Sequence, residues 1–230
     1  MTGAMTQMLR LQWLASRWLL LVLALICIGL PQAVVRLAVL GAHGADRNLI
    51  PAALLQSLDS ISVLFPYLAA ITGALIALAA WNWDHRTGHV YALSLPISRA
   101  EYALLKLWAG AVALLVPTVA IWIGAWIATS TVPIPDGLHA YPFAFGVRFL
   151  LAGTIVYGTM FALASGTIRT TLIVTIGWCA LFIGGSLLVP WLESQYAIEL
   201  LSPTEMLGHA FAEWPGPFRV FAGSWLLIDV

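Results

Sequence analysis

Residues 84–106 read DHRTGHVYALSLPISRAEYALLK, a polar stretch that lies between two uncharged apolar runs, residues 60–83 and 107–135. A helix of about 20 predominantly apolar residues crosses the hydrocarbon core of a bilayer. Each of the two runs exceeds this length, so the polar stretch predicts a loop that joins two transmembrane helices. The chain is therefore expected to be an integral membrane protein.

Further uncharged runs occur on both sides of this stretch. They cover residues 18–35, 149–168 and 170–192, and another run begins at Val220 but ends before Asp229. We therefore expect an all-α, polytopic fold of six transmembrane helices in one transmembrane domain over residues 1–230, with the sixth helix truncated. The first run is too long for the apolar core of a cleaved signal peptide, so we expect it to remain as a span.

The composition supports the membrane assignment. Hydrophobic residues make up 61% of the chain and charged residues 9%, and the mean hydropathy is +0.94. These values leave too little polar surface to cover a soluble globule. The formal net charge is zero, so no broad basic surface for nucleic acid is expected. Cys27 and Cys179 lie in apolar runs, where a thiol behaves as a small hydrophobe rather than as half of a disulfide.

The basic residues indicate the orientation, because Lys and Arg near the ends of spans tend to stay in the cytoplasm. With the N-terminus inside, the cytoplasmic residues are Arg10, Arg17, Arg86, Arg99, Lys106 and Arg169, and the outer residues are Arg36, Arg47, Arg148 and Arg219. This bias predicts that residues 84–106 lie on the cytoplasmic side and residues 191–217 outside. Ser98 and Glu101 form an S-x-x-E capping box, which predicts that the third membrane helix starts near Arg99.

Two segments outside the spans are predicted to lie along the membrane surface. Ser202 and Glu205 form a second capping box, which predicts a short helix within the extracytoplasmic helical segment 191–217. Residues 5–17 mix apolar and basic side chains, which suits an interfacial helix on the inner surface. An extension of the first span fits the same residues equally well.

The sequence contains no motif for chemistry of its own. A P-loop needs G-x-x-x-x-G-K-[ST], and the single lysine, Lys106, follows Leu105 rather than glycine. His85 and His89 have the spacing of two metal ligands on one helix face, but Gly88 weakens a helix there and no third ligand is evident. We therefore expect no catalytic site, no metal site and no cofactor bound by this chain.

The loop and the arrangement of spans together resemble the ABC-2 type permease family. In that family an acidic residue and a glycine precede an S-x-P-[IV]-S-R-x-E stretch that ends in a lysine. The matching residues here are Asp84, Gly88, Ser94, Pro96, Ile97, Ser98, Arg99, Glu101 and Lys106. The residue match covers only this loop, whereas the order of spans covers nearly the whole chain. The unfinished sixth span and the two loop histidines depart from the family pattern.

The resemblance implies a multi-pass exporter subunit of the cell membrane, the inner membrane in a bacterium. Two such permease chains, identical or related, would pair within the membrane lipid and bind separate cytoplasmic ATPase subunits that hold ATP and Mg²⁺. The loop would couple ATP hydrolysis to export of a lipid-like, amphiphilic or peptide cargo. Its implied coupling residues are Asp84, Arg86, Thr87, Gly88, Ser94, Pro96, Ser98, Arg99 and Glu101. A capped helix gives such a loop a stiff end, and polar residues suit a soluble partner.

Other polar and small residues have roles that the sequence leaves open. The candidates for the transport pathway or an outer gate are Arg148, Asp59, His209 and Glu213. Arg148 is also placed to snorkel to the outer surface from the start of the fourth span. The candidates for contact with a second permease chain are the small residues Gly29, Gly177 and Gly184.

Two other classes of function fit the same sequence. One is a non-transporting membrane anchor or sensor subunit, in which residues 84–106 form an ordinary solvated loop whose charges only set the topology. The other is a membrane-embedded enzyme whose site follows no familiar motif. An ATPase bound to the chain would favour the permease over both.

Overall fold

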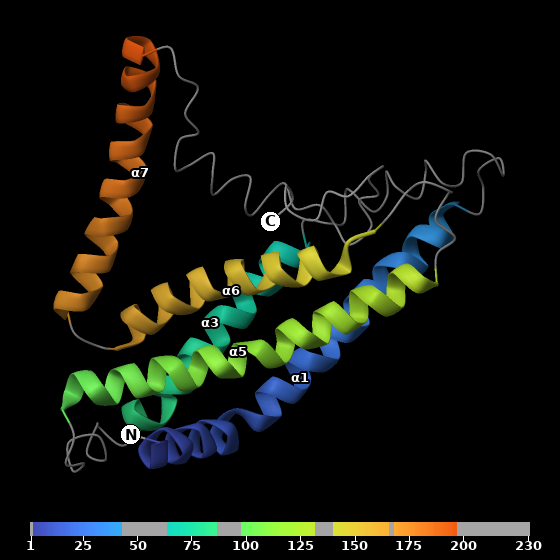
Figure 1. The fold of residues 1–230 in the computed structure, drawn as a ribbon, viewed down its shortest axis with the longest axis horizontal. Coiled ribbons are helices and arrows are strands. Elements are labelled where there is room, and N and C mark those ends of the chain that lie inside the picture. The colour runs from blue at the N-terminus through green and yellow to red at the C-terminus, as the bar shows by residue number, and fades with distance from the viewer. Residues whose placement is uncertain (1, 43–63, 87–97, 132–139, 166–167, 197–230) are drawn as a thin grey trace.

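The computed structural model describes residues 2–42, 64–86, 98–131, 140–165 and 168–196, and these residues are almost all α-helical. The helices are α1 (Thr2–Ala42), α3 (Leu64–Arg86), α5 (Arg99–Ser130), α6 (Pro142–Ala164) and α7 (Ile168–Tyr196) (Figure 1). The described residues contain no strand. The predicted all-α class is confirmed for this part of the chain.

Four of the helices contain a stretch that is long and apolar enough to cross a membrane. These stretches are Gln12–Leu37 in α1, Leu64–Asn82 in α3, Arg99–Ser130 in α5 and Pro142–Ala164 in α6. In α7 the apolar stretch is shorter, Thr171–Gly185. The fold is thus that of a membrane protein with four helices able to span the bilayer. The predicted sixth span and the predicted helix after Ser202 lie outside the described residues.

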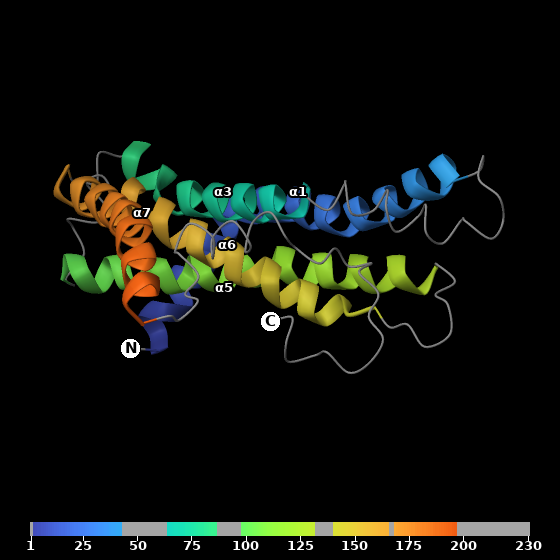
Figure 2. The ribbon, with the colours of Figure 1, turned by 90° about the horizontal axis from the view of Figure 1, so that it is seen from above.

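The four long helices pack side by side with alternating chain directions. α1 and α5 run one way, whereas α3 and α6 run the other way (Figure 1). α1 packs along α5, α3 packs along α6, and α5 and α6 join the two pairs. Seen from above, α6 lies between α3 and α5 (Figure 2). The beginning of α1, the end of α3 and the beginning of α5 therefore lie at the same end of the bundle. α7 follows α6 and extends away from the other four helices (Figure 1).

The predicted interfacial helix over residues 5–17 is not a separate element, because these residues are part of α1. No glycine or proline occurs between Met5 and Trp18, so nothing in the sequence interrupts the helix there. α1 has 41 residues, which corresponds to about 60 Å at about 1.5 Å per residue. The hydrocarbon core is only about 30 Å thick, so part of α1 must lie beyond it. Its first turns run at an angle to the rest of the helix (Figure 1).

Two clusters of buried apolar side chains lie between the four helices. One cluster includes Cys27, Val34, Phe65, Ile121 and Phe149, and the other includes Leu20, Ile76, Trp81, Leu114 and Tyr157. Each cluster takes residues from α1, α3, α5 and α6, so both clusters connect all four helices. The burial of Cys27 agrees with its expected behaviour as a small hydrophobe, whereas Cys179 is exposed and both thiols are free.

Glycines let the helix backbones approach closely at two crossings. A Cβ at Gly73 of α3 would lie 2.9 Å from the backbone nitrogen of Tyr157 in α6. A Cβ at Gly124 of α5 would lie 2.8 Å from the carbonyl oxygen of Ile28 in α1. Gln32 Nε2 of α1 donates a hydrogen bond of 2.8 Å to the Gly124 carbonyl at the second crossing. Such contacts matter in lipid, where apolar burial does not drive helices together.

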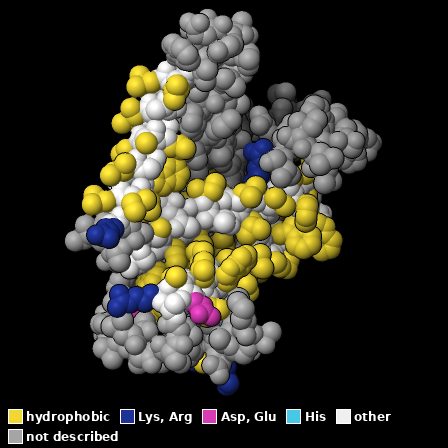
Figure 3. Space-filling model, turned by 60° about the vertical axis from the view of Figure 1, so that its left-hand side comes forward, with side chains coloured by type: hydrophobic (Ala, Val, Ile, Leu, Met, Phe, Trp, Pro, Cys, Tyr) yellow, Lys and Arg dark blue, Asp and Glu magenta, His cyan; other side chains and the backbone are white. Residues whose placement is uncertain are grey.

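The outer surface of the bundle is largely apolar. Figure 3 shows one face on which hydrophobic side chains predominate and charged side chains are few. Large apolar side chains are strongly exposed on α1 and α7, for example Trp18 at 70% and Ile173 at 71% of their surface. A continuous exposed apolar surface of this kind is suited to hydrocarbon rather than to water.

Candidate functional site

Asp84 lies inside the helix bundle and not in the loop where the sequence analysis placed it. α3 continues through His85 to Arg86, so Asp84 belongs to the last turn of this helix. Only 1% of its surface is exposed. The carboxylate is thus buried in this structure rather than presented to solvent, and a coupling role for Asp84 stays a prediction. The next residues of the helix are polar, but they do not end it.

The Asp84 carboxylate binds two side chains from the beginning of α5. Lys106 Nζ lies 2.5 Å from Asp84 Oδ2 and forms an ion pair with it. The Tyr102 hydroxyl donates to the same carboxylate, at 3.0 Å from Oδ1 and 3.2 Å from Oδ2. Tyr102 and Lys106 are four residues apart, so they project from one face of α5, one turn from each other. All three side chains are buried.

Aromatic rings complete the surroundings of the lysine. Lys106 Nζ lies 4.7 Å from the centre of the Trp81 ring and 5.2 Å from the centre of the Tyr102 ring. Both distances are within the range of attractive cation–π contacts. Trp81 also packs against Phe161 of α6, with 5.2 Å between the ring centroids. The Lys106 ammonium of α5 thus contacts α3 directly, through Asp84 and Trp81. Trp81 in turn connects this group to α6.

We call the three side chains of Asp84, Tyr102 and Lys106 the inter-helix clamp. A buried carboxylate or ammonium without a partner is costly, since each has lost its hydration. The ion pair and the hydrogen bonds of the tyrosine compensate for this loss only while α3 and α5 remain in register. The clamp therefore fixes the end of α3 against the beginning of α5, on the two sides of residues 87–97.

The predicted start of α5 is confirmed. Ser98 is the N-cap residue, its side-chain oxygen accepts a hydrogen bond of 3.2 Å from the Glu101 backbone N–H, and α5 begins at Arg99. Ser98, Arg99 and Glu101 are exposed. The first turn of α5 therefore offers an exposed arginine and glutamate, while the following turn turns inward to Asp84.

Ser98→Ala is expected to lower the free energy of unfolding by about 1 kcal/mol, the typical cost of removing an N-cap side chain. The loss should be local, because the clamp still holds the next turns of α5. Hydrogen exchange of the Glu101 amide, measured with the protein in detergent, checks this expectation. Faster exchange throughout α5 would show that the cap supports far more than the first turn.

The other predicted site residues are only partly placed by the structure. Thr87, Gly88, Ser94 and Pro96 lie outside the described residues, as do Asp59, His209 and Glu213. Arg86 is the last residue of α3. Arg148 lies in the second turn of α6 and is half-buried, at the end of the bundle opposite to the clamp. Arg148 is therefore distant from the coupling residues that the structure describes, namely Asp84, Arg86, Ser98, Arg99 and Glu101.

Lys106 and Tyr102 were not assigned a role in the site from the sequence, although Lys106 ends the family-like motif. One signal could have indicated them. Lys106 is the only lysine of the chain, it follows Tyr102 by one helical turn, and it leads directly into an apolar run. An ionisable residue at such a position is expected to have a buried partner, and Asp84 is the acidic residue at the end of the preceding apolar run.

No group of three or more His, Cys, Asp or Glu side chains that could hold a metal ion occurs among the described residues. The clamp combines one negative and one positive side chain with a tyrosine hydroxyl, so its formal charges balance. Comparison of the chain with models of protein families, with curated proteins and with solved structures gave no match.

Proposed function

We propose that this chain is the permease subunit of an ATP-driven exporter and that residues 84–106 couple it to separate ATPase subunits. The observation that carries the proposal is the inter-helix clamp. A loop that transmits movement from a soluble partner needs flanking helices that move as one body. The ion pair between Asp84 and Lys106 supports such a connection, because it joins the last turn of α3 to α5 on the two sides of residues 87–97.

The exposed first turn of α5 supports the same role. Arg99 and Glu101 are exposed at the end of the bundle where α3 ends and α5 begins, so they are available to charged groups of a partner. Movement of this turn would pass through the clamp to α3. It would also pass along α5 to α1 and α6, because α5 packs against both. The loop resembles the ABC-2 permease motif, and from this resemblance we infer that the partner is an ATPase that binds ATP and Mg²⁺.

The proposal includes a second permease chain, identical or related. The candidates for this contact are Gly29, Gly177 and Gly184, and a Cβ at any of them would meet no atom of the described residues within 4 Å. Gly177 and Gly184 lie on α7, which extends away from the other helices (Figure 1). Small residues on an open helix face allow close approach of another helix in lipid.

The proposed cargo is lipid-like, amphiphilic or a peptide, and the proposed direction is export across the cell membrane.

The test is co-purification of the tagged full chain from its native membrane in a mild detergent, with mass spectrometry of the bound proteins. The expected result is a complex of two permease chains with P-loop ATPase subunits. Arg99→Glu and Glu101→Lys should each reduce the bound ATPase by about tenfold, since reversing an interfacial charge places like charges together. Glu101→Lys also removes a favourable charge from the helix N-terminus, but that costs only about 0.3–1 kcal/mol and should leave membrane insertion intact.

The matched control is Arg169→Glu, which reverses an exposed arginine at the beginning of α7, outside the loop. It should retain the normal amount of ATPase. Normal ATPase binding by both loop variants would contradict the coupling role of this turn. Absence of any ATPase from the wild-type complex would contradict the permease assignment itself and favour an anchor or sensor.

A further inference from the structure

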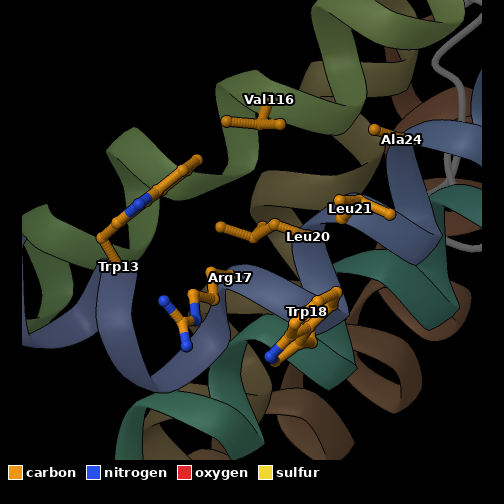
Figure 4. A pocket seen from close by; sticks show the side chains of 7 residues that line it. All are labelled: Trp13, Arg17, Trp18, Leu20, Leu21, Ala24 and Val116. Atoms are coloured by element: carbon orange, nitrogen blue, oxygen red, sulfur yellow. The ribbon is translucent and has the colours of Figure 1, made fainter.

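A cavity of about 450 Å³ lies between α1 and α5, beside the angle near the beginning of α1 (Figure 4). Its size is within the range of small-molecule sites, about 300–1,000 Å³. Six of its lining residues come from α1 and one from α5, and they are Trp13, Arg17, Trp18, Leu20, Leu21, Ala24 and Val116. The cavity lies outside the inter-helix clamp, so the inference from it is independent of the proposed function.

The lining is charged at one end and apolar along the rest. Leu20, Leu21 and Ala24 follow Arg17 by three, four and seven residues, so they continue the same face of α1 for about 10 Å. Val116 of α5 lies opposite this face. In Figure 4 the side chains of Trp13, Leu20 and Val116 surround the space, and Arg17 projects on the side away from Val116. A ligand that fills the cavity and meets Arg17 must be anionic at one end and apolar at the other.

The local charge favours a net negative ligand. Arg10 precedes Arg17 by about two helical turns, and no acidic residue occurs before Asp46 in the sequence. The Arg17 guanidinium lies over the Trp18 ring at 5.8 Å, a contact that leaves the N–H groups at its edge able to donate to an anion. Among the described residues no carboxylate lies within ion-pair distance of Arg17. The cavity therefore offers a donor for a phosphate and no acceptor for a cationic headgroup.

Two tryptophans place the mouth of this cavity at the level of lipid headgroups. Trp13 and Trp18 are exposed at 52% and 70% of their surface, and tryptophan concentrates at the boundary between membrane and water. Arg17 lies between them in the sequence and close to the beginning of the apolar stretch Gln12–Leu37. The anionic end of a bound ligand would thus lie among headgroups, and its apolar end would lie within the acyl region.

We propose that this cavity binds one anionic phospholipid, with its phosphate on Arg17 and an acyl chain against Leu21, Ala24 and Val116. A soluble phosphate compound would leave the apolar wall unfilled, and a zwitterionic lipid would bring a cationic group next to Arg10 and Arg17. The preference for an anionic lipid follows from these two arginines, and the preference for a lipid follows from the apolar wall.

Native mass spectrometry of the purified full chain in neutral detergent tests the proposal. The chain is titrated separately with phosphatidylglycerol and with phosphatidylcholine of identical acyl chains. The first phosphatidylglycerol molecule is expected to bind at least about fivefold more tightly than the first phosphatidylcholine molecule. This is the gain in affinity that one basic residue gives near an anionic headgroup. Arg17→Gln should remove most of this preference. Arg36→Gln is the matched control, because it removes an exposed arginine from the other end of α1 and should change the preference by less than about twofold.

Two further measurements separate a lipid site from a general attraction of basic residues. Leu21→Trp should weaken phosphatidylglycerol binding although both arginines remain, because the larger ring occupies the space for the acyl chain. Glycerophosphoglycerol, the same headgroup without acyl chains, should not displace the lipid at equal concentration. Equal affinity for the two lipids, equal losses in Arg17→Gln and Arg36→Gln, or displacement by the soluble headgroup would each overturn the proposal.

Discussion

Asp84→Leu is expected to lower the free energy of unfolding by about 3–5 kcal/mol, the usual loss when one member of a buried ion pair is removed. Lys106 is only 5% exposed in the structure, so the variant removes the carboxylate partner of a buried ammonium. The remaining contacts of the ammonium with the rings of Trp81 and Tyr102 replace only part of the lost attraction. The measurement is equilibrium unfolding of the purified protein in mixed micelles of dodecyl sulfate and a neutral detergent.

The double variant Asp84→Leu with Lys106→Met serves as the control for this first prediction. It replaces both charges by apolar side chains of similar volume, a change that is often neutral or stabilising for buried pairs. Most of the stability lost in the single variant should therefore return. A single variant that loses less than about 1 kcal/mol would mean that the lysine reaches water, and the clamp would then not exist as described.

Gly73→Ala is expected to lower the free energy of unfolding by about 1–3 kcal/mol, the range found for overpacked cores. The added Cβ would press on backbone atoms of α6, namely the carbonyl oxygen of Gly153 and the nitrogen of Tyr157. A backbone atom cannot turn aside like the end of a side chain, so α3 and α6 must separate. The separation would also disturb Tyr157, whose hydroxyl donates a hydrogen bond of 2.9 Å to the Leu107 carbonyl of α5.

Gly158→Ala is the matched control for this second prediction. Gly158 lies in α6 as well, but a Cβ there would meet no atom within 4 Å in the part of the chain that the structure describes. Alanine should therefore leave stability unchanged or raise it by up to about 1 kcal/mol, since alanine favours the helix over glycine. The same unfolding assay in mixed micelles checks both variants. Equal effects of the two substitutions would show that the α3–α6 crossing is not limited by the backbone contact at Gly73.

The sequence by itself determined the elements that depend on local chemistry. The lengths of the uncharged runs indicated the membrane-crossing stretches of α1, α3, α5 and α6, because a bilayer requires about 20 apolar residues. The capping box at Ser98 predicted that α5 begins near Arg99, where it does begin, because a cap is made within a few residues of the helix end. Both features can be seen in a short window of sequence.

The tertiary structure decided which residues act together. Asp84 is expected in the loop from the sequence, because polar residues follow it. In the structure α3 continues for two more residues, and the side chain of Asp84 contacts Lys106, 22 residues later in the chain. Likewise the glycines of the close crossings, Gly73 and Gly124, were not distinguished from the other small residues of the spans. Apolar runs determine that helices form, whereas the rotation of each helix about its axis depends on packing against the others.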